Sequence, residues 1–158
     1  MRATPTPPPL TRLALCLVAA WTAAACSGSG AEAELRVVPA DEEFVLAPGE
    51  TVVVARTGLH VTFEGVAEDG RCPIEWFCIW AGNAIVRVRV APASFPTRRV
   101  VELNTGLDPR AACVGRHELV LVSLEPQPSV TNPVPPDGYR ATFRVSAALC
   151  VTAQEDTG

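Results

Sequence analysis

Cysteine is the residue type in this chain whose spacing carries the most chemistry. Of the six cysteines, four lie well past the N-terminal region, at Cys72, Cys78, Cys113 and Cys150. Four cysteines in an oxidising compartment are typical of two disulfides. Cys72 and Cys78 enclose only five residues. Their nearness favours a Cys72–Cys78 bond, which leaves Cys113 to bond with Cys150.

A zinc site is the alternative chemistry for these four cysteines. Structural zinc ligands usually come in close pairs with about two to four residues between them. Neither of the cysteine spacings in this chain fits that pattern. We therefore expect no metal site and no cofactor.

The segment RCPIEWFCIWAGN is the densest local signal. A Cys72–Cys78 bond would close a tight loop with Pro73 at its start and Trp76 and Phe77 near its tip. In one interpretation Trp80, together with Trp76, covers the end of the core as a lid. In the other interpretation, the cross-linked loop presents Trp76 and Phe77 to a protein partner. Because the disulfide already orders the loop, less conformational entropy is lost on binding. Because aromatic side chains usually pack into cores, we favour the lid and expect Trp80 to be buried.

Catalytic patterns are missing from the sequence. It contains no G-x-S-x-G nucleophile elbow and no H-E-x-x-H, P-loop or EF-hand pattern. The two histidines are expected on the surface, His60 on the outward face of a strand and His117 beside Glu118. Paired acids such as Glu68–Asp69 are expected in turns or at strand edges, where carboxylates are usually solvated. We therefore predict that the protein is not an enzyme.

Residues 1–25 have the parts of a secretory signal. Arg2 and Arg12 precede an apolar run of 13 residues that ends in three alanines, too short for a membrane-spanning helix, which needs roughly 20 residues. Cys26 follows directly, as in a bacterial lipoprotein signal, where the thiol of that cysteine is lipidated. Position 23 is Ala where such signals usually have Leu, and Ala-Ala-Ala also suits ordinary signal cleavage. A secreted soluble protein is therefore the alternative.

Lipidation of Cys26 would place the protein outside the cytoplasm, on the cell membrane or the outer membrane. Two or three acyl chains would hold it firmly, because each buried methylene contributes roughly 0.8 kcal/mol. Residues 26–34, CSGSGAEAE, are then the lipid-anchor cysteine and a flexible tether.

The composition of the mature chain limits its partners. Removal of the signal leaves 133 residues, enough for one domain with a real core. The chain has arginine but no lysine. The mature chain contains 11 arginines and 17 acidic residues, which gives a net charge of −6. An acidic surface argues against nucleic acid and anionic lipid headgroups as partners, and it favours solubility.

Alternation of apolar and polar residues predicts an all-β domain. Three runs alternate strictly, as half-buried strands do: Leu59–Glu64, Ala84–Val90 and Tyr139–Val145. Less regular candidates are Leu35–Val38, Phe44–Leu46, Thr51–Ala55, Val100–Leu103 and His117–Leu124. Turn residues separate these runs. Seven or eight short strands predict a single antiparallel β-sandwich or small barrel over residues 35–152, with two disulfides, followed by a flexible tail at residues 153–158.

The last two predicted strands should form a hairpin that the Cys113–Cys150 bond staples. With Leu124 opposite Tyr139 and no net bulge, Val122 lies opposite Ala141 on an apolar face, and the same register brings the two cysteines opposite each other. The alternative is a one-residue slip, which pairs Leu121 with Ala141 and offsets the cysteines. The connecting segment Pro126–Gly138 holds five prolines. We expect it to be an extended connection that crosses the end of the sandwich, and a recognition surface is the alternative.

The pattern RCP-x4-C-x-W-A-G-N-A resembles an uncharacterised family of small secreted bacterial lipoproteins. The matching positions are Cys72, Pro73, Cys78, Trp80, Ala81, Gly82, Asn83 and Ala84. The match is best over Phe44–Val90. The resemblance implies that Pro73, Trp80 and Gly82 belong to a structural motif. It implies no activity, because we know of no established function for that family.

Together these features predict an exported, lipid-anchored, non-catalytic protein of the cell envelope that acts as a structural or binding module. Its expected partners are the membrane, through the lipid anchor, and a protein that the sequence does not identify. A protein-binding inhibitor that presents the Cys72–Cys78 loop is the alternative, and an enzyme is the less favoured one.

Overall fold

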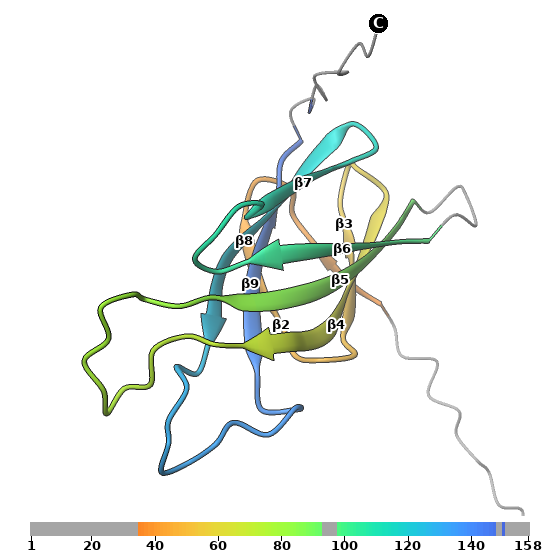
Figure 1. Cartoon of the computed structure of the whole chain (residues 1–158). Helices are drawn as coiled ribbons and strands as arrows, with labels where there is room; N and C mark the ends of the chain where they lie inside the picture. Colours follow the sequence, from red (N-terminus) through yellow and green to blue (C-terminus); the bar gives the residue numbers. More distant parts are fainter. Residues whose placement is uncertain (1–34, 93–97, 148–149, 151–158) are drawn as a thin grey trace, which may run out of the picture. The chain divides into compact units, whose positions relative to one another are not determined.

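The computed structural model describes residues 35–92, 98–147 and 150. The predicted signal, tether and tail lie outside these residues. Within these residues, nine strands form two sheets, and there is no helix (Figure 1). Together with the two disulfides, this arrangement confirms the predicted all-β fold. A search of the described residues for membrane-spanning helices found none.

The two sheets contain five and four strands. The five-stranded sheet has the order β1 (Arg36–Val38), β3 (Thr51–Val54), β4 (Leu59–Asp69), β5 (Ala84–Pro92) and β6 (Arg99–Asn104). The four-stranded sheet has the order β2 (Glu43–Leu46), β9 (Arg140–Val145), β8 (His117–Glu125) and β7 (Ala111–Val114). Neighbouring strands are antiparallel, except that β1 runs parallel to β3.

The core lies between the two sheets and follows the predicted alternation. Val86, Val88 and Val90 of β5 are fully buried, as the two-residue period requires. Phe63 from the five-stranded sheet and Phe143 from the four-stranded sheet are also fully buried, and their ring centroids lie 5.9 Å apart. Apolar residues from both sheets therefore share one core.

The sequence analysis missed one strand and one bulge. β7 was not predicted, because its four residues do not alternate. In the β8–β9 hairpin Leu124 lies opposite Ala141, and the register shifts by one residue between Leu121 and Ser123. The predicted register is therefore wrong by two residues at Leu124. The bulge at Val122 then shifts the pairing by one residue, so that Leu121 and not Val122 faces the core. The core-facing residues of β8 are Leu119, Leu121 and Leu124.

Both predicted disulfides are present. The Cα atoms of Cys113 and Cys150 lie 5.8 Å apart, but Cys113 pairs with Glu118 in the ladder of β7 with β8. Cys150 follows β9 and donates its backbone N–H to the Arg116 carbonyl at 2.6 Å. The bond therefore ties edge strand β7 to the segment after β9, and the loop-entropy model assigns it about 3.9 kcal/mol. With all four cysteines paired, the zinc alternative is wrong.

Two β-bulges bend β4, the strand that leads into the β4–β5 connection. β4 continues to Asp69, beyond the end predicted from alternation, because its register with β5 shifts between Phe63 and Gly65 and again between Val66 and Glu68. Bulges increase local twist and bend a strand. The bent ends of β4 and β5 carry the connection that projects from this end of the sheet (Figure 1).

Candidate functional site

The connection between β4 and β5 contains residues 72–80, which we call the aromatic loop (Figure 1). The Cys72–Cys78 disulfide closes its first seven residues, and Ile79 and Trp80 follow directly. The Cα atoms of Cys72 and Cys78 lie 6.0 Å apart. At the tip, Trp76 donates its backbone N–H to the Pro73 carbonyl at 3.0 Å, which folds the chain into a turn. The loop-entropy model assigns this short closure about 2.4 kcal/mol.

A close backbone approach fixes the base of the aromatic loop. Cys72 donates its backbone N–H to the Ala81 carbonyl at 2.9 Å. Gly82 has a φ of 74°, and a Cβ on it would lie 2.0 Å from the Gly70 carbonyl oxygen and 2.8 Å from the Arg71 Cα. Only glycine fits this position, because it tolerates positive φ and needs no room for a side chain.

The apolar side chains of the aromatic loop are exposed. The exposed fractions are 63% for Trp76, 102% for Phe77 and 82% for Trp80. Ile74 and Ile79 are exposed as well, at 68% and 90%. The predicted lid is therefore wrong: Trp80 lies in solvent, because the disulfide and the turn hold the loop away from the sheets.

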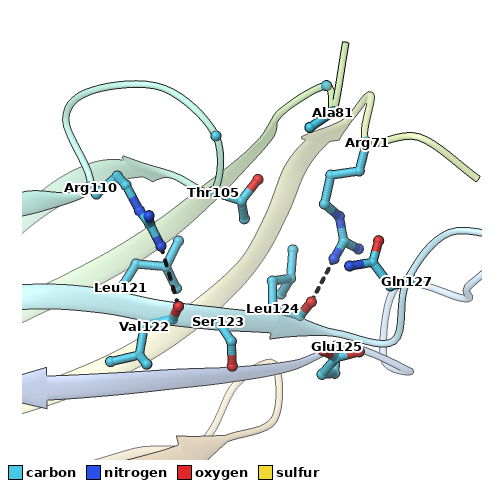
Figure 2. Close-up of a pocket in the computed structure, with 12 residues that line it drawn as sticks. Arg71, Ala81, Thr105, Arg110, Leu121, Val122, Ser123, Leu124, Glu125 and Gln127 are labelled. Atoms are coloured by element: carbon cyan, nitrogen blue, oxygen red, sulfur yellow. Dashed lines mark hydrogen bonds between the residues drawn. The ribbon is translucent and has the colours of Figure 1, made fainter. Parts of the chain in front are cut away.

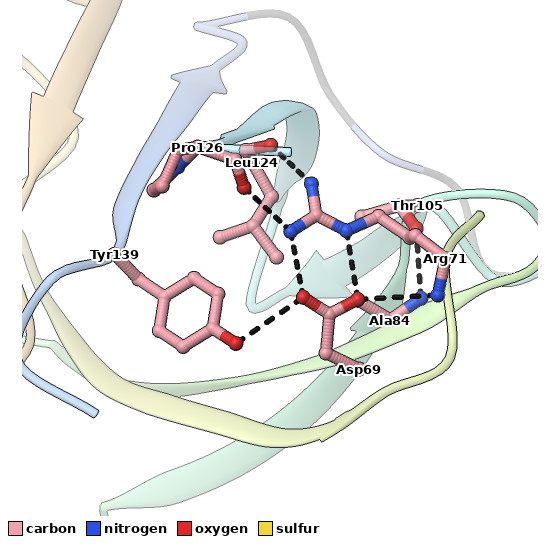
Figure 3. A network of polar contacts seen from close by, with 7 residues as sticks. All are labelled: Asp69, Arg71, Ala84, Thr105, Leu124, Pro126 and Tyr139. Atoms are coloured by element: carbon pink, nitrogen blue, oxygen red, sulfur yellow. Dashed lines mark hydrogen bonds and ion pairs between the residues drawn. The ribbon is translucent and has the colours of Figure 1, made fainter. Parts of the chain in front are cut away.

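A polar network occupies the end of the core instead of an aromatic lid (Figure 3). The guanidinium of Arg71 donates to Asp69 Oδ1 from Nε at 2.9 Å and to Oδ2 from Nη2 at 2.7 Å. It also donates to the backbone carbonyls of Leu124 at 2.5 Å and Pro126 at 2.8 Å. Tyr139 donates its hydroxyl to Asp69 Oδ2 at 3.2 Å. Charge and hydrogen bonds are thus matched in a buried site, as such sites require.

The network was not predicted, because Asp69 was expected to be a solvated turn residue. Its side chain is only 9% exposed. Burial by itself raises the pKa of Asp69, but the hydrogen bonds and positive charge of Arg71 outweigh that effect and hold this pKa below its ordinary value. The pKa of the Tyr139 hydroxyl is raised, first by burial and then by the Asp69 charge.

A second loop, residues 126–138, packs beside the aromatic loop; we call it the proline loop. Pro128 accepts the Ile74 backbone N–H at 3.0 Å. The Glu75 carboxylate accepts hydrogen bonds from the Ser129 hydroxyl, the Val130 backbone N–H at 3.1 Å and the Thr131 hydroxyl at 2.9 Å. The two loops therefore form one unit at this end of the domain.

These contacts keep Glu75 ionised. The hydrogen bond from Ser129, with those from Val130 and Thr131, lowers the pKa of Glu75 to about 2. A groove of about 380 Å³ lies between the two loops, lined by Ile74, Glu75 and residues of the proline loop. The charged side chain of the aromatic loop is thus turned toward the proline loop.

A smaller hollow of about 230 Å³ lies beside β8 (Figure 2). β7 pairs with β8 only as far as Val120. Beyond that point Arg110 donates to the Val122 carbonyl at 3.4 Å, and Arg71 donates to the Leu124 carbonyl. The two guanidinium groups cap the open edge of β8, which protects it against pairing with another strand.

Neither histidine forms a catalytic pair within the described residues. His117 Nδ1 lies 3.1 Å from the Ser146 carbonyl oxygen, and His60 makes no hydrogen bond to a carboxylate or hydroxyl in the part of the chain that the structure describes. The same described residues contain no group of three or more His, Cys, Asp or Glu side chains that could hold a metal ion. The aromatic loop is therefore the feature on which a function can be argued.

Searches of protein-family models, curated proteins and solved structures found no match to this chain.

Proposed function

We propose that this protein is an exported, lipid-anchored and non-catalytic binding module of the cell envelope, which engages its partner through the aromatic loop. Two disulfides suit an oxidising compartment outside the cytoplasm. Export and lipidation are supported by the short apolar run and by Cys26 directly after three alanines. The resemblance of the RCP-x4-C-x-W-A-G-N-A pattern to a family of small secreted bacterial lipoproteins supports a location outside the cytoplasm.

The observation that carries this proposal is the exposure of five large apolar side chains within residues 74–80. Soluble proteins rarely expose contiguous apolar patches without a binding role. Tryptophan is among the residues that contribute most to binding energy at interfaces. The disulfide and the contacts to the proline loop hold the aromatic loop in one shape, which lowers the entropy lost on binding.

The inhibitor alternative receives less support from the geometry. A peptide that adds to a target as a strand must be extended. The hydrogen bond from Trp76 to Pro73 folds the tip of the aromatic loop into a turn instead. A convex, folded tip is better suited to burial of its side chains in a partner surface.

Site-specific photo-crosslinking in cells tests the proposal. A photoreactive phenylalanine analogue replaces Phe77, and a matched control carries it at Leu107, which is 62% exposed in the β6–β7 connection. We expect a discrete adduct, either with a protein or with lipid, from position 77 and none from position 107. Equal adduct formation at both positions, or none at either, would contradict the proposal.

A further inference from the structure

We propose, on the basis of the function given above, that the partner of the aromatic loop is the surface of a lipid bilayer. The loop inserts its apolar side chains at the level of the headgroups, and the binding does not depend on the charge of the lipid. The lipid on Cys26 and the aromatic loop are then two attachments to one membrane.

The chemistry of the loop fits a bilayer better than a protein surface. A protein interface carries roughly one hydrogen bond per 100–200 Å² and a polar rim. Among the side chains of residues 73–80, the only charged one is Glu75, and its carboxylate is engaged by the proline loop. Trp76 and Trp80 combine an apolar ring with one N–H donor, the combination that is enriched where membrane meets water.

The shape of the loop points the same way. Phe77 is fully exposed, and its neighbours Trp76 and Ile79 are more than half exposed. The apex is therefore convex and presents side chains in several directions. A fluid surface can surround such an apex without a complementary pocket.

Charge plays little part in this attachment. Arg71 is the cation that adjoins the loop in sequence, and it is buried against Asp69. The chain contains no lysine. The apex thus has no cationic group for anionic headgroups, and the net charge of the mature chain is negative. Apolar burial is the remaining driving force.

A short segment separates Cys26 from the first strand. Arg36 of β1 pairs with Val52 of β3, and Val52 pairs with Val61 of β4. Arg36 is thus level with Val61, eight residues before Asp69, so the chain enters β1 beside the first part of β4 and not beside the aromatic loop. Nine residues from Cys26 precede Leu35, so the chain between them spans at most about 30 Å. A tether of this length raises the effective concentration of the domain at the bilayer, where weak insertion suffices.

Intrinsic fluorescence with vesicles tests the proposal. The probe is the chain of residues 26–158 with Cys26→Ser, which contains every described strand and both disulfides. Its only tryptophans are Trp76 and Trp80. With phosphatidylcholine vesicles we expect a blue shift of emission, and quenching when the acyl chains are brominated. Phe77→Asp should lower the partition coefficient about tenfold, whereas the control Leu107→Asp, at an exposed apolar residue outside the loop, should leave it unchanged.

Three outcomes would overturn the bilayer proposal. They are no blue shift with phosphatidylcholine, binding that requires phosphatidylglycerol and disappears in high salt, and equal weakening by Phe77→Asp and Leu107→Asp. Thermal unfolding of each variant checks that the domain remains folded. If the chain does not bind phosphatidylcholine vesicles but position 77 crosslinks to a protein in cells, the bilayer is the wrong partner and the proposed binding function stands. If both experiments fail, the binding function is wrong as well.

Discussion

Arg71 and Asp69 form a bidentate ion pair in which Nη2 lies 2.7 Å from Oδ2 and Nε lies 2.9 Å from Oδ1. Asp69 ends β4 in the five-stranded sheet, and Arg71 also binds the Leu124 carbonyl of β8 in the four-stranded sheet. The residue next to the Cys72–Cys78 disulfide thus joins both sheets. This attachment at the base is what allows the tip of the aromatic loop to remain in solvent.

Removal of this guanidinium should destabilise the domain strongly. Arg71→Met leaves the Asp69 carboxylate buried without its partner, and we expect the free energy of unfolding to fall by about 3–5 kcal/mol. Tyr139→Phe removes a single hydrogen bond and should cost about 0.5–1.5 kcal/mol. Urea unfolding followed by circular dichroism measures both. A loss for Arg71→Met no larger than that for Tyr139→Phe would contradict this role.

The same pair makes stability depend on pH. Because the pKa of Asp69 is lower in the folded protein than its ordinary value, the unfolded chain binds a proton at this residue first as the pH falls. The stabilisation is therefore fully present above about pH 4 and decreases below it. The loss of stability between pH 7 and pH 3, measured by urea unfolding, should be smaller in Asp69→Asn than in wild type. Equal losses would show that Asp69 does not contribute.

The exposed tryptophans should contribute little to stability. Trp80→Ala and Trp76→Ala are expected to change the free energy of unfolding by less than about 0.5 kcal/mol, as most surface substitutions do. Phe143→Ala, which empties a fully buried site, should cost about 3–5 kcal/mol. Thermal and urea unfolding of the three variants give the comparison. A cost for Trp80→Ala close to that for Phe143→Ala would restore the lid.

Strict alternation made most of the fold predictable. Val86, Val88 and Val90 could be assigned to the core because one buried face imposes a two-residue period on a strand. β7 was not predicted, because its sequence, AACV, is short and does not alternate between apolar and polar residues. The bulge at Val122 was not predicted, because a single inserted residue does not change the composition of a strand in a recognisable way.

The candidate site was predictable only in part. Cys72 and Cys78 could be paired from their spacing, and Trp76 and Phe77 could be placed at the tip of their loop. The exposure of Trp80 could not be predicted, because a general preference of aromatic residues for cores decided the interpretation. Nor could the burial of Asp69 be foreseen, since its partner Tyr139 lies 70 residues away in the chain.

Lipidation at Cys26 remains a prediction from the sequence alone. Cells that express the full chain should incorporate labelled palmitate into the wild-type protein, and Cys26→Ser should lose the label. Cys16→Ser, in the apolar run of the signal, is the matched control and should retain it. Equal labelling of wild type and Cys26→Ser would contradict lipidation at this residue.

The central claim is that the aromatic loop stands in solvent, free to bind. Acrylamide quenching of tryptophan fluorescence in the chain of residues 26–158 carrying Cys26→Ser tests this most directly, because Trp76 and Trp80 are its only tryptophans. Without vesicles or a partner, we predict emission like that of indole in water and quenching close to that of a free tryptophan derivative. Blue-shifted emission that acrylamide does not reach would place these side chains in the core and contradict the claim.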